Sequence, residues 1–389
     1  MGKKKALLVV AGGRGVPDVL PLLYLQPDLV LTITSEEGWQ GQRAFLDIAS
    51  AIPSCQVKPP PKVDAYDLDA GMKACRDLCK TYPETEWEWT FTITSAPKVL
   101  AIAAYEVAKE IGIPCWHIDA QRDKVVSLIK KVEVDKKRFF HLSFDGYVKI
   151  QGRTCKEKSG PTLDCRQTAQ NWSEVAQEMA LSRDAHHLTP IFYRHKKSGE
   201  LDQVVKVPIP LSTEIETTPL VQFLVDYGLL LSKRDGSDKI MYYFASKDAA
   251  QFLGTGDWLE VYVWHQANRA NFADDIRWGY SVIKDQVYLE LDLVLMYKAQ
   301  LVIGECKTNE KPFRGQNNYL RDIDAVADLL GGTYVSKVFI TNQLGEGQSY
   351  KIFNQQAEER NIVVIAGERL HEVGQILEEQ AKHPKYPRK

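Results

Sequence analysis

The sequence VYLELDLVLMYKAQLVIGECKT, residues 287–308, has the pattern of two β-strands joined by a tight turn. In the first half apolar residues recur at every second position, so they share one face of a strand and Glu290 and Asp292 share the other. In the second half Glu305 and Lys307 are also two residues apart and share a face. The stretch therefore predicts a hairpin that gathers acidic side chains and a lysine.

The turn decides how close these acids come. If it is centred between Lys298 and Ala299, Asp292 lies directly opposite Glu305, with Cβ atoms about 4.5–5.5 Å apart. Two carboxylates at this distance repel each other unless a cation or a proton lies between them. Carboxylate oxygens suit Mg²⁺ or Mn²⁺, and Lys307 adds a positive charge at the same place. The hairpin therefore predicts a divalent-metal site that acts on phosphate.

An acidic pair on one strand of a hairpin, followed by Glu-x-Lys on the next, resembles the core of the PD-(D/E)xK nucleases. Here the pattern stands as Asp292 and then Glu305-Cys306-Lys307. The resemblance implies a metal-dependent nuclease in which Asp292 and Glu305 bind Mg²⁺ or Mn²⁺ and the carbonyl of Cys306 completes the coordination. Lys307 would orient the attacking water. The Cys306 side chain should face the opposite, apolar side of the strand.

Two further acids are candidates for the same site. Glu290 shares the strand face of Asp292, and Glu260 lies beside an apolar face of a helix expected over 257–267. In this nuclease fold a leading helix often delivers one acid to the metal, and Gly-Asp-Trp-Leu-Glu resembles the wording of the family there. We therefore expect Glu260 or Glu290 as the additional carboxylate.

The elements after the hairpin fit the same core. Periodicity and composition predict a helix, a strand, a helix and a strand at 316–330, 337–341, 350–359 and 362–366. The order α-β-β-α-β, with the hairpin in its middle, is the nuclease core that the resemblance implies. Gln316 and Tyr319 open the first of these helices, where either a substrate contact or an ordinary helix start is expected.

The first 120 residues alternate strands and helices. Strands are predicted at 5–12, 28–34, 87–94 and 113–118, and helices at 16–26, 38–50, 67–81 and 97–111. Such alternation predicts a parallel sheet covered by helices on both faces, a Rossmann-like α/β domain. Further strands are expected at 125–130 and 139–150, with Asp145-Gly146 as a hairpin turn.

Three turns of this domain follow strands whose carboxyl ends meet at one sheet edge. Thr-Ile-Thr-Ser occurs at 32–35 and at 92–95, and Ala-Gly-Gly-Arg-Gly occurs at 11–15. One such turn alone would more often be a helix cap. Three together suit phosphate or another anion, and the absence of a full G-x-G-x-x-G argues against a dinucleotide. The residues expected to contact the anion are Gly13, Arg14, Thr34, Ser35, Glu36, Thr94, Ser95, Ala96, Pro97 and Lys98.

This layout and the turn Thr94-Ser95-Ala96-Pro97-Lys98 resemble the CRISPR-associated Rossmann-fold (CARF) sensor domain. The corresponding turn of that family is usually of the Thr-Gly-Gly-Thr-Lys type; here the Thr and the Lys are kept and the glycines are absent. The family senses cyclic oligoadenylates, and members fused to this nuclease type usually sense cyclic tetra-adenylate. Because that ring contains a two-fold axis, the resemblance implies a homodimer with the ligand between its subunits.

Length and composition bound these expectations. The 389 residues are 44% apolar with a net charge of −2, which is ordinary for a soluble globular protein. No apolar run is long enough for a membrane helix, and seven scattered cysteines fit a reduced, cytoplasmic setting. Because the net charge is slightly negative, any binding of nucleic acid must depend on a local positive patch. We expect a CARF domain at 1–152, a connector at 153–217, a nuclease domain at 218–382 and a basic tail at 383–389.

Together these patterns predict a metal-dependent endonuclease of CRISPR antiviral defence that cleaves DNA or RNA, or both, and that cyclic tetra-adenylate activates allosterically. One alternative is an ungated PD-(D/E)xK restriction or repair nuclease whose N-terminal domain only dimerises. Another is a non-catalytic regulator that senses a cyclic nucleotide and binds nucleic acid. A small-molecule α/β enzyme is a weaker alternative, because the N-terminal crevice shows no obvious catalytic nucleophile paired with a general base.

Overall fold

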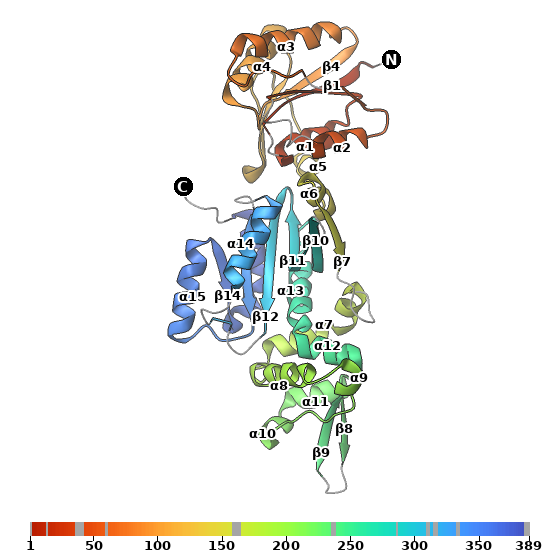
Figure 1. The fold of residues 1–389 in the computed structure, drawn as a ribbon, viewed down its shortest axis with the longest axis vertical. Helices are drawn as coiled ribbons and strands as arrows, with labels where there is room; N and C mark the ends of the chain where they lie inside the picture. The colour runs from red at the N-terminus through yellow and green to blue at the C-terminus, as the bar shows by residue number, and fades with distance from the viewer. Residues whose placement is uncertain are drawn as a thin grey trace. The chain divides into compact units, whose positions relative to one another are not determined.

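The computed structural model describes residues 2–12, 15–35, 43–58, 61–157, 165–234, 239–284, 287–308, 312–313, 318–331 and 335–384. The chain divides into two units, Met1–Thr154 with Lys298–Gln300, and Cys155–Tyr297 with Leu301–Lys389. Each unit combines helices with a six-stranded sheet (Figure 1). Within the described ranges, no helix is long and apolar enough to cross a membrane.

The first unit is built on a sheet of strand order β3-β2-β1-β4-β5-β6. Its strands are β1 (Lys4–Ala11), β2 (Leu29–Thr34), β3 (Gln56–Val57), β4 (Trp87–Thr92), β5 (Cys115–Asp119) and β6 (Lys124–Ser127). Its helices are α1 (Gly15–Leu25), α2 (Arg43–Ser50), α3 (Leu68–Thr81), α4 (Lys98–Ile111), the short η2 (Ala120–Arg122), α5 (Lys136–Phe139) and α6 (Phe144–Ile150). The pairs are parallel except β5 with β6, so the Rossmann-like layout is confirmed.

Burial on both faces explains the apolar runs of this sheet. Leu8 of β1 packs with residues of α3 and α4, and its neighbour Val9 is equally buried on the other face. A strand that is covered on both faces requires a nearly continuous apolar sequence. The register places Val9 between Thr32 of β2 and Thr92 of β4, so two threonines lie on the face away from α3 and α4.

The segment 139–150, where the composition predicted a strand and a turn at Asp145-Gly146, is largely helical, and that prediction is wrong. Ser143 caps α6 by accepting a hydrogen bond from the N–H of Gly146 at 3.2 Å. Phe144 and Tyr147 then lie one helical turn apart and are both buried. Tertiary packing of this apolar helix face outweighs the preference of aromatic residues for strands.

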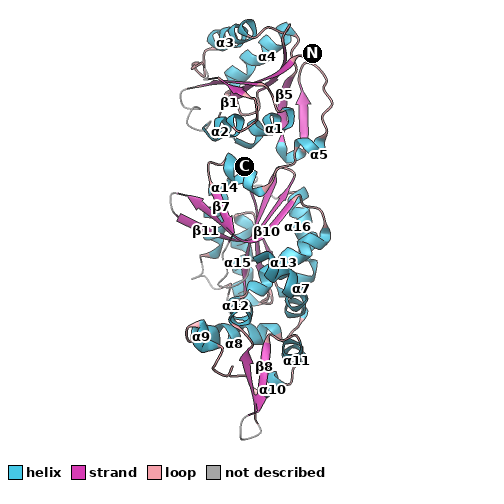
Figure 2. Ribbon diagram, turned by 90° about the vertical axis from the view of Figure 1, so that its right-hand side faces the viewer, coloured by secondary structure: helices cyan, strands magenta, loops and turns pink. Residues whose placement is uncertain are grey.

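The second unit contains a sheet of order β14-β13-β12-β11-β10-β7 and a separate pair, β8-β9 (Figure 2). Its strands are β7 (Thr154–Glu157), β8 (Leu230–Arg234), β9 (Ile240–Phe244), β10 (Asp275–Lys284), β11 (Val287–Tyr297), β12 (Gln300–Lys307), β13 (Val335–Thr341) and β14 (Ile362–Ile365). Its helices are α7 (Cys165–Leu181), α8 (Ala185–Lys197), α9 (Leu201–Val204), α10 (Thr213–Glu216), α11 (Pro219–Asp226), α12 (Lys247–Thr255), α13 (Asp257–Ala270), α14 (Tyr319–Leu330), α15 (Gly347–Glu359), η4 (Gly367–Glu372) and α16 (Val373–Lys382).

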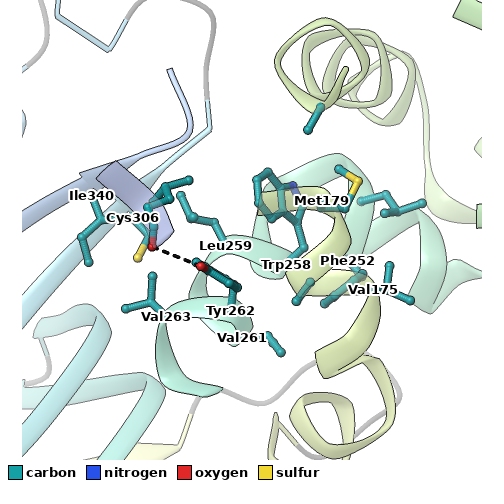
Figure 3. Packing of buried hydrophobic residues seen from close by; sticks show 14 of the residues in the cluster. Val175, Met179, Phe252, Trp258, Leu259, Val261, Tyr262, Val263, Cys306 and Ile340 are labelled. Atoms are coloured by element: carbon teal, nitrogen blue, oxygen red, sulfur yellow. Dashed lines mark hydrogen bonds between the residues drawn. The ribbon is translucent and has the colours of Figure 1, made fainter. Parts of the chain in front are cut away.

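Different helices cover the two faces of the larger sheet. On one face, Leu293 of β11 and Cys306 of β12 join a core formed with α7, α8, α12, α13 and α16. Figure 3 shows Cys306 and residues of α7, α12 and α13 in this core. On the other face, Phe339 of β13 packs against Tyr319 of α14 and Phe353 of α15. The hairpin of β11 and β12 is therefore held between two helical layers.

Two features of this unit differ from the sequence expectation. The segment 153–217, expected as a connector with some structure of its own, supplies β7 and α7 to α10. Val175 and Met179 lie in the same core as α13 (Figure 3). Strand β10 was not predicted, although alternate apolar residues such as Trp278 and Val282 provide the period-2 signal. It pairs antiparallel with β11 along its length.

The turn between β11 and β12 is counted with the first unit. Lys298 and Ala299 alone separate the two strands, as the sequence predicted, and Lys298 adopts a left-handed φ of 56°. Ala299 is buried in an apolar cluster of the first unit, and Lys298 forms an ion pair with Asp123. Nε2 of Gln300 donates a hydrogen bond to the carbonyl of Ala120 at 2.8 Å. The turn is thus fixed by packing and by polar contacts.

Candidate functional site

Asp292, Glu305 and Lys307 come together on the face of the hairpin that α14 covers. Nζ of Lys307 lies 2.5 Å from Oε1 of Glu305 and 3.2 Å from Oδ2 of Asp292. The carboxylate of Asp292 also accepts a hydrogen bond from the backbone N–H of Cys306 at 2.8 Å. One ammonium group therefore bridges two carboxylates on neighbouring strands.

Burial and charge set the electrostatics of this cluster. Desolvation, together with the nearby charge of Asp292, raises the pKa of Glu305 to about 7, although Lys307 acts to lower it. For Lys307, burial lowers the pKa, but the two carboxylates outweigh burial and the pKa rises above its ordinary value. The lysine is thus a permanent cation, and a second cation at the carboxylates would relieve their repulsion.

The thiol of Cys306 points away from this cluster. It packs near Ile340 in the core on the α13 side of the sheet (Figure 3), as the alternation of the strand predicted. Desolvation, followed by the charge of Asp292, raises the pKa of the thiol well above its ordinary value, so it is a neutral core group. The proposed role of the Cys306 carbonyl as a metal ligand stays a prediction.

The two candidates for an additional acid differ in burial. Glu260 on α13 is 7% exposed, and its charge contributes to the raised pKa of Cys306, which places it near β12. Glu290 is exposed, and it pairs in register with Ser281 on β10. Glu260 is therefore the more buried candidate, on the α13 side of the sheet, whereas Glu290 shares the strand face of Asp292. A direct bond from either residue to a metal stays a prediction.

The donor set of the cluster fits a hard divalent cation. Across the part of the chain that the structure describes, no three His, Cys, Asp or Glu side chains are arranged to hold a metal. Asp292 and Glu305 nevertheless provide two carboxylates around one ammonium. Mg²⁺ is commonly bound through one or two carboxylates and keeps water or phosphate oxygens as its other ligands. The site therefore suits Mg²⁺ or Mn²⁺ better than Zn²⁺, whose structural sites need four protein ligands.

Tyr319 covers the catalytic candidate Lys307 from α14. Nζ of Lys307 lies 5.6 Å from the centroid of the tyrosine ring, within the range of a cation–π interaction. The ring stacks on Phe339, with centroids 5.8 Å apart. Tyr319 therefore limits the positions that the Lys307 side chain can adopt on the α14 side of the sheet. Gln316, which the sequence placed beside it, lies outside the described residues.

In the first unit, the hydroxyls of the expected ligand turns bind other protein groups. Thr34 is fully buried and donates to the carbonyl of Ser35 at 3.1 Å, and Ser35 itself is buried. Oγ1 of Thr94 accepts a hydrogen bond from the N–H of Ile118 at 2.7 Å. These bonds hold the turns in shape, so backbone N–H groups and cations are the better candidates for contact with an anion.

The start of α4 is the part of the crevice best suited to phosphate. Pro97 is the N-cap and makes no side-chain capping bond, so it leaves the first N–H groups of this 14-residue helix without a partner from the cap. Ala96 closes the turn before it, bonding the carbonyl of Ile93, and the side chain of Lys98 is exposed. Three other expected contacts lie outside the described residues: Gly13, Arg14 and Glu36.

Asp18 belongs to this crevice although the sequence analysis missed it. Its carboxyl is 3% exposed and accepts a hydrogen bond from Ser95, whose hydroxyl accepts one from the N–H of Gly12 at 3.1 Å. A Cβ at Gly12 would lie 1.8 Å from the carbonyl oxygen of Ser95, so only glycine fits there. An acid one turn into a helix after a glycine-rich loop is the signal that would have found it.

Comparisons with known proteins found a family match for part of the second unit and similar folds for the whole chain. The family model described as Card1-like, endonuclease domain matches residues 246–384. The fold is similar to Can2 from Sulfobacillus thermosulfidooxidans, solved in complex with cyclic tetra-adenylate, at 17% identity, 97% coverage of each chain and a TM-score of 0.74. It is similar to protein VC1899 from Vibrio cholerae at 18% identity, 98% and 99% coverage of this chain and that chain, and a TM-score of 0.75. No curated protein matches the sequence.

A third similar structure is a type III CRISPR defence DNA nuclease activated by cyclic oligoadenylate, at 15% identity and a TM-score of 0.57. The match covers all of this chain and 53% of that one. These findings confirm the expected resemblance to CRISPR-associated ancillary nucleases. They also confirm the fold class, an α/β chain with a Rossmann-like domain followed by an endonuclease-like domain.

Removing the bridging cation should cost stability through the carboxylates it leaves behind. We expect Lys307→Met to lower the free energy of unfolding at pH 8, without divalent ions, by about 1–3 kcal/mol, because Asp292 and Glu305 then repel without compensation. Adding Glu305→Gln should restore most of this loss. Urea unfolding of the single and double variants measures the coupling.

Lys351→Met, an exposed lysine on α15, is the control for this cycle and should change the free energy of unfolding by less than about 0.5 kcal/mol. Strictly additive effects of Lys307→Met and Glu305→Gln would show that the three side chains do not form one electrostatic unit.

Proposed function

We propose that this protein is a metal-dependent endonuclease that cleaves DNA or RNA, or both, and that cyclic tetra-adenylate bound by its CARF domain activates it in CRISPR antiviral defence. The observation that carries the proposal is the Asp292–Lys307–Glu305 cluster, which lies inside the region that matches a Card1-like endonuclease domain. Similarity of fold to Can2, solved with cyclic tetra-adenylate, supports the choice of activator.

The residues of the hairpin have separate roles in this proposal. Asp292 and Glu305 would hold Mg²⁺ or Mn²⁺, with the Cys306 carbonyl and Glu260 as further candidates. A bound cation would place positive charge beside the oxygens of the scissile phosphate and would lower the pKa of a nearby water. Lys307, directed by both carboxylates, orients the attacking water and stabilises negative charge that develops on the phosphate in the transition state.

Activation would reach the site through the hairpin. Strands β11 and β12 carry Asp292 and Glu305 in the second unit, whereas the turn residues Lys298–Gln300 are counted with the first. A displacement of this turn would pass along two hydrogen-bonded strands to the carboxylates. Such gating requires the ligand to bind one arrangement better than another. We propose a cytoplasmic, symmetric homodimer, because two equal half-sites match the two-fold axis of the ligand.

A cleft beside α14 offers a path for the nucleic-acid strand. It has a volume of about 460 Å³ and lies between residues of α14 and α15. Arg321 and Arg360 line it together with Phe313 and Ile352, so it combines cations for phosphate with apolar groups for a base. Arg360 is already paired with Asp324 at 2.6 Å, which leaves the exposed Arg321 as the better phosphate contact.

The nuclease proposal is tested by incubating the full chain with supercoiled plasmid or single-stranded RNA and Mn²⁺, with and without cyclic tetra-adenylate. We expect cleavage that depends on both the metal and the ligand. Lys307→Ala should abolish cleavage and leave ligand binding unchanged, whereas Lys351→Ala should cleave normally. Cleavage without the ligand would favour an ungated nuclease, and ligand binding without any cleavage would favour a regulator. Full activity of Lys307→Ala would refute the site.

The ligand crevice is tested at the start of α4. Lys98→Ala removes an exposed cation next to the uncapped helix end, so we expect cyclic tetra-adenylate to bind about 5-fold to 30-fold more weakly, a loss of about 1–2 kcal/mol. Lys109→Ala removes an exposed cation from the last turn of the same helix and should leave the affinity unchanged. Calorimetric titration measures both, and equal affinities would place the ligand elsewhere.

The substrate path is tested by charge reversal. Arg321→Glu should raise KM for the nucleic acid about tenfold and weaken its salt dependence, with little change in kcat, because the arginine contacts phosphate away from the reacting atoms. Lys351→Glu reverses an exposed charge on α15 outside the cleft lining. If both variants shift KM equally, the effect comes from overall charge and not from the cleft.

A further inference from the structure

A short chain of hydrogen bonds ties two ligand turns together beneath the crevice. The N–H of Gly12, after β1, donates to the hydroxyl of Ser95, after β4, and that hydroxyl donates to Oδ2 of Asp18 on α1. Gly12 also lies so close to the Ser95 carbonyl that a side chain at this position would push the two turns apart. Asp18 therefore determines where the turn after β4 sits relative to the turn after β1.

Among the described residues, Asp18 makes these contacts without a counter-charge. It is 3% exposed, and its second oxygen, Oδ1, has no hydrogen-bond partner among the described residues. The hydroxyls of Thr32 and Thr92, on the sheet face away from α3 and α4, are likewise without a partner in that part of the chain. Neutral hydroxyls can solvate a protonated carboxyl but cannot balance a buried negative charge.

No charged neighbour takes up this role within the described residues. The charged side chains on the helices that pack against α1, and at the start of α4, are all exposed: Arg43, Asp47, Lys98, Lys136, Lys137, Arg138, Asp145 and Lys149. Burial raises the pKa of Asp18 to about 7, and only the hydrogen bond from Ser95 lowers it in part. The carboxyl therefore changes its charge near neutral pH.

We propose that Asp18 is a positioning residue for the anionic ligand of this crevice, and that its charge opposes binding of a polyanion. The proposal rests on the proposed function of the CARF domain. In the protonated form Oδ2 still accepts the bond from Ser95, so the turns stay in place and no negative charge lies beneath the phosphates. In the ionised form the geometry is the same but the charge repels the ligand. Affinity should therefore fall as the pH rises through about 7.

The test measures binding of cyclic tetra-adenylate to the full-length protein at pH 6 and pH 8. For the unaltered protein we expect affinity to fall about fivefold between these two pH values, the effect of a ligand that raises a carboxyl pKa from about 7 by about one unit. Asp18→Asn keeps an acceptor for Ser95 without the charge, so it should bind tightly at both pH values. Ser95→Ala should bind more weakly at both and keep the pH dependence. Asp47→Asn, an exposed acid on α2, should behave like the unaltered protein.

A ligand-free measurement separates charge from misfolding. A raised carboxyl pKa means that the folded state binds the proton more tightly, so stability is lost as the pH rises from the unfolded value of 3.8 through about 7. Asp18→Asn should therefore raise Tm relative to the unaltered protein more at pH 8 than at pH 5. Equal differences at both pH values would overturn the buried titration on which the inference depends.

The two proposals fail in different ways. Binding of the ligand with the same pH dependence in the unaltered protein and in Asp18→Asn would overturn the role of Asp18 and leave the proposed function intact. If the unaltered protein does not bind cyclic tetra-adenylate at any pH, the proposed function of the CARF domain fails and this inference fails with it.

Discussion

The ammonium of Lys307 between Asp292 and Glu305 is the interaction on which the second unit depends. Desolvation of Glu305, and then its repulsion by Asp292 on the neighbouring strand, raise the pKa of Glu305 to about 7. The lysine offsets that repulsion while remaining partly exposed. The helices on the two faces of the sheet keep the hairpin largely out of water. The remaining repulsion between the carboxylates therefore favours binding of a metal cation.

The two units treat a buried carboxyl in opposite ways. Asp292 lies against a lysine and a backbone N–H, which suits a group that must stay ready to bind a cation. Asp18 accepts a hydrogen bond from the hydroxyl of Ser95, has no charged partner in the part of the chain that the structure describes, and lies under a crevice suited to anions. The same side chain is therefore paired with charge where a cation is expected, and left without charge where phosphates are expected.

Local patterns predicted the parts of the fold in which neighbouring residues decide the outcome. The period-2 alternation and the two-residue turn of the hairpin are properties of adjacent residues, and they placed Asp292, Glu305 and Lys307 on one face. The aromatic segment around Phe144 was assigned wrongly because its burial depends on packing partners elsewhere in the chain. Strand β10 was not predicted, although its apolar residues alternate clearly. The helices α7 to α10 pack into a core whose other residues lie far away in the sequence, so local patterns could not predict it.

The sequence by itself determined that the chain is α/β, that its hairpin carries an acid pair and a lysine, and that three turns of a Rossmann-like sheet end at one edge. Only the tertiary structure decided which of Glu260 and Glu290 is buried near the hairpin, and that the turn hydroxyls of Thr34, Thr94 and Ser95 bind protein groups. The reason is that periodicity fixes the face on which a side chain lies, whereas burial and hydrogen-bond partners depend on segments distant in sequence. Asp18 shows this most clearly, because its importance comes from Ser95, 77 residues away.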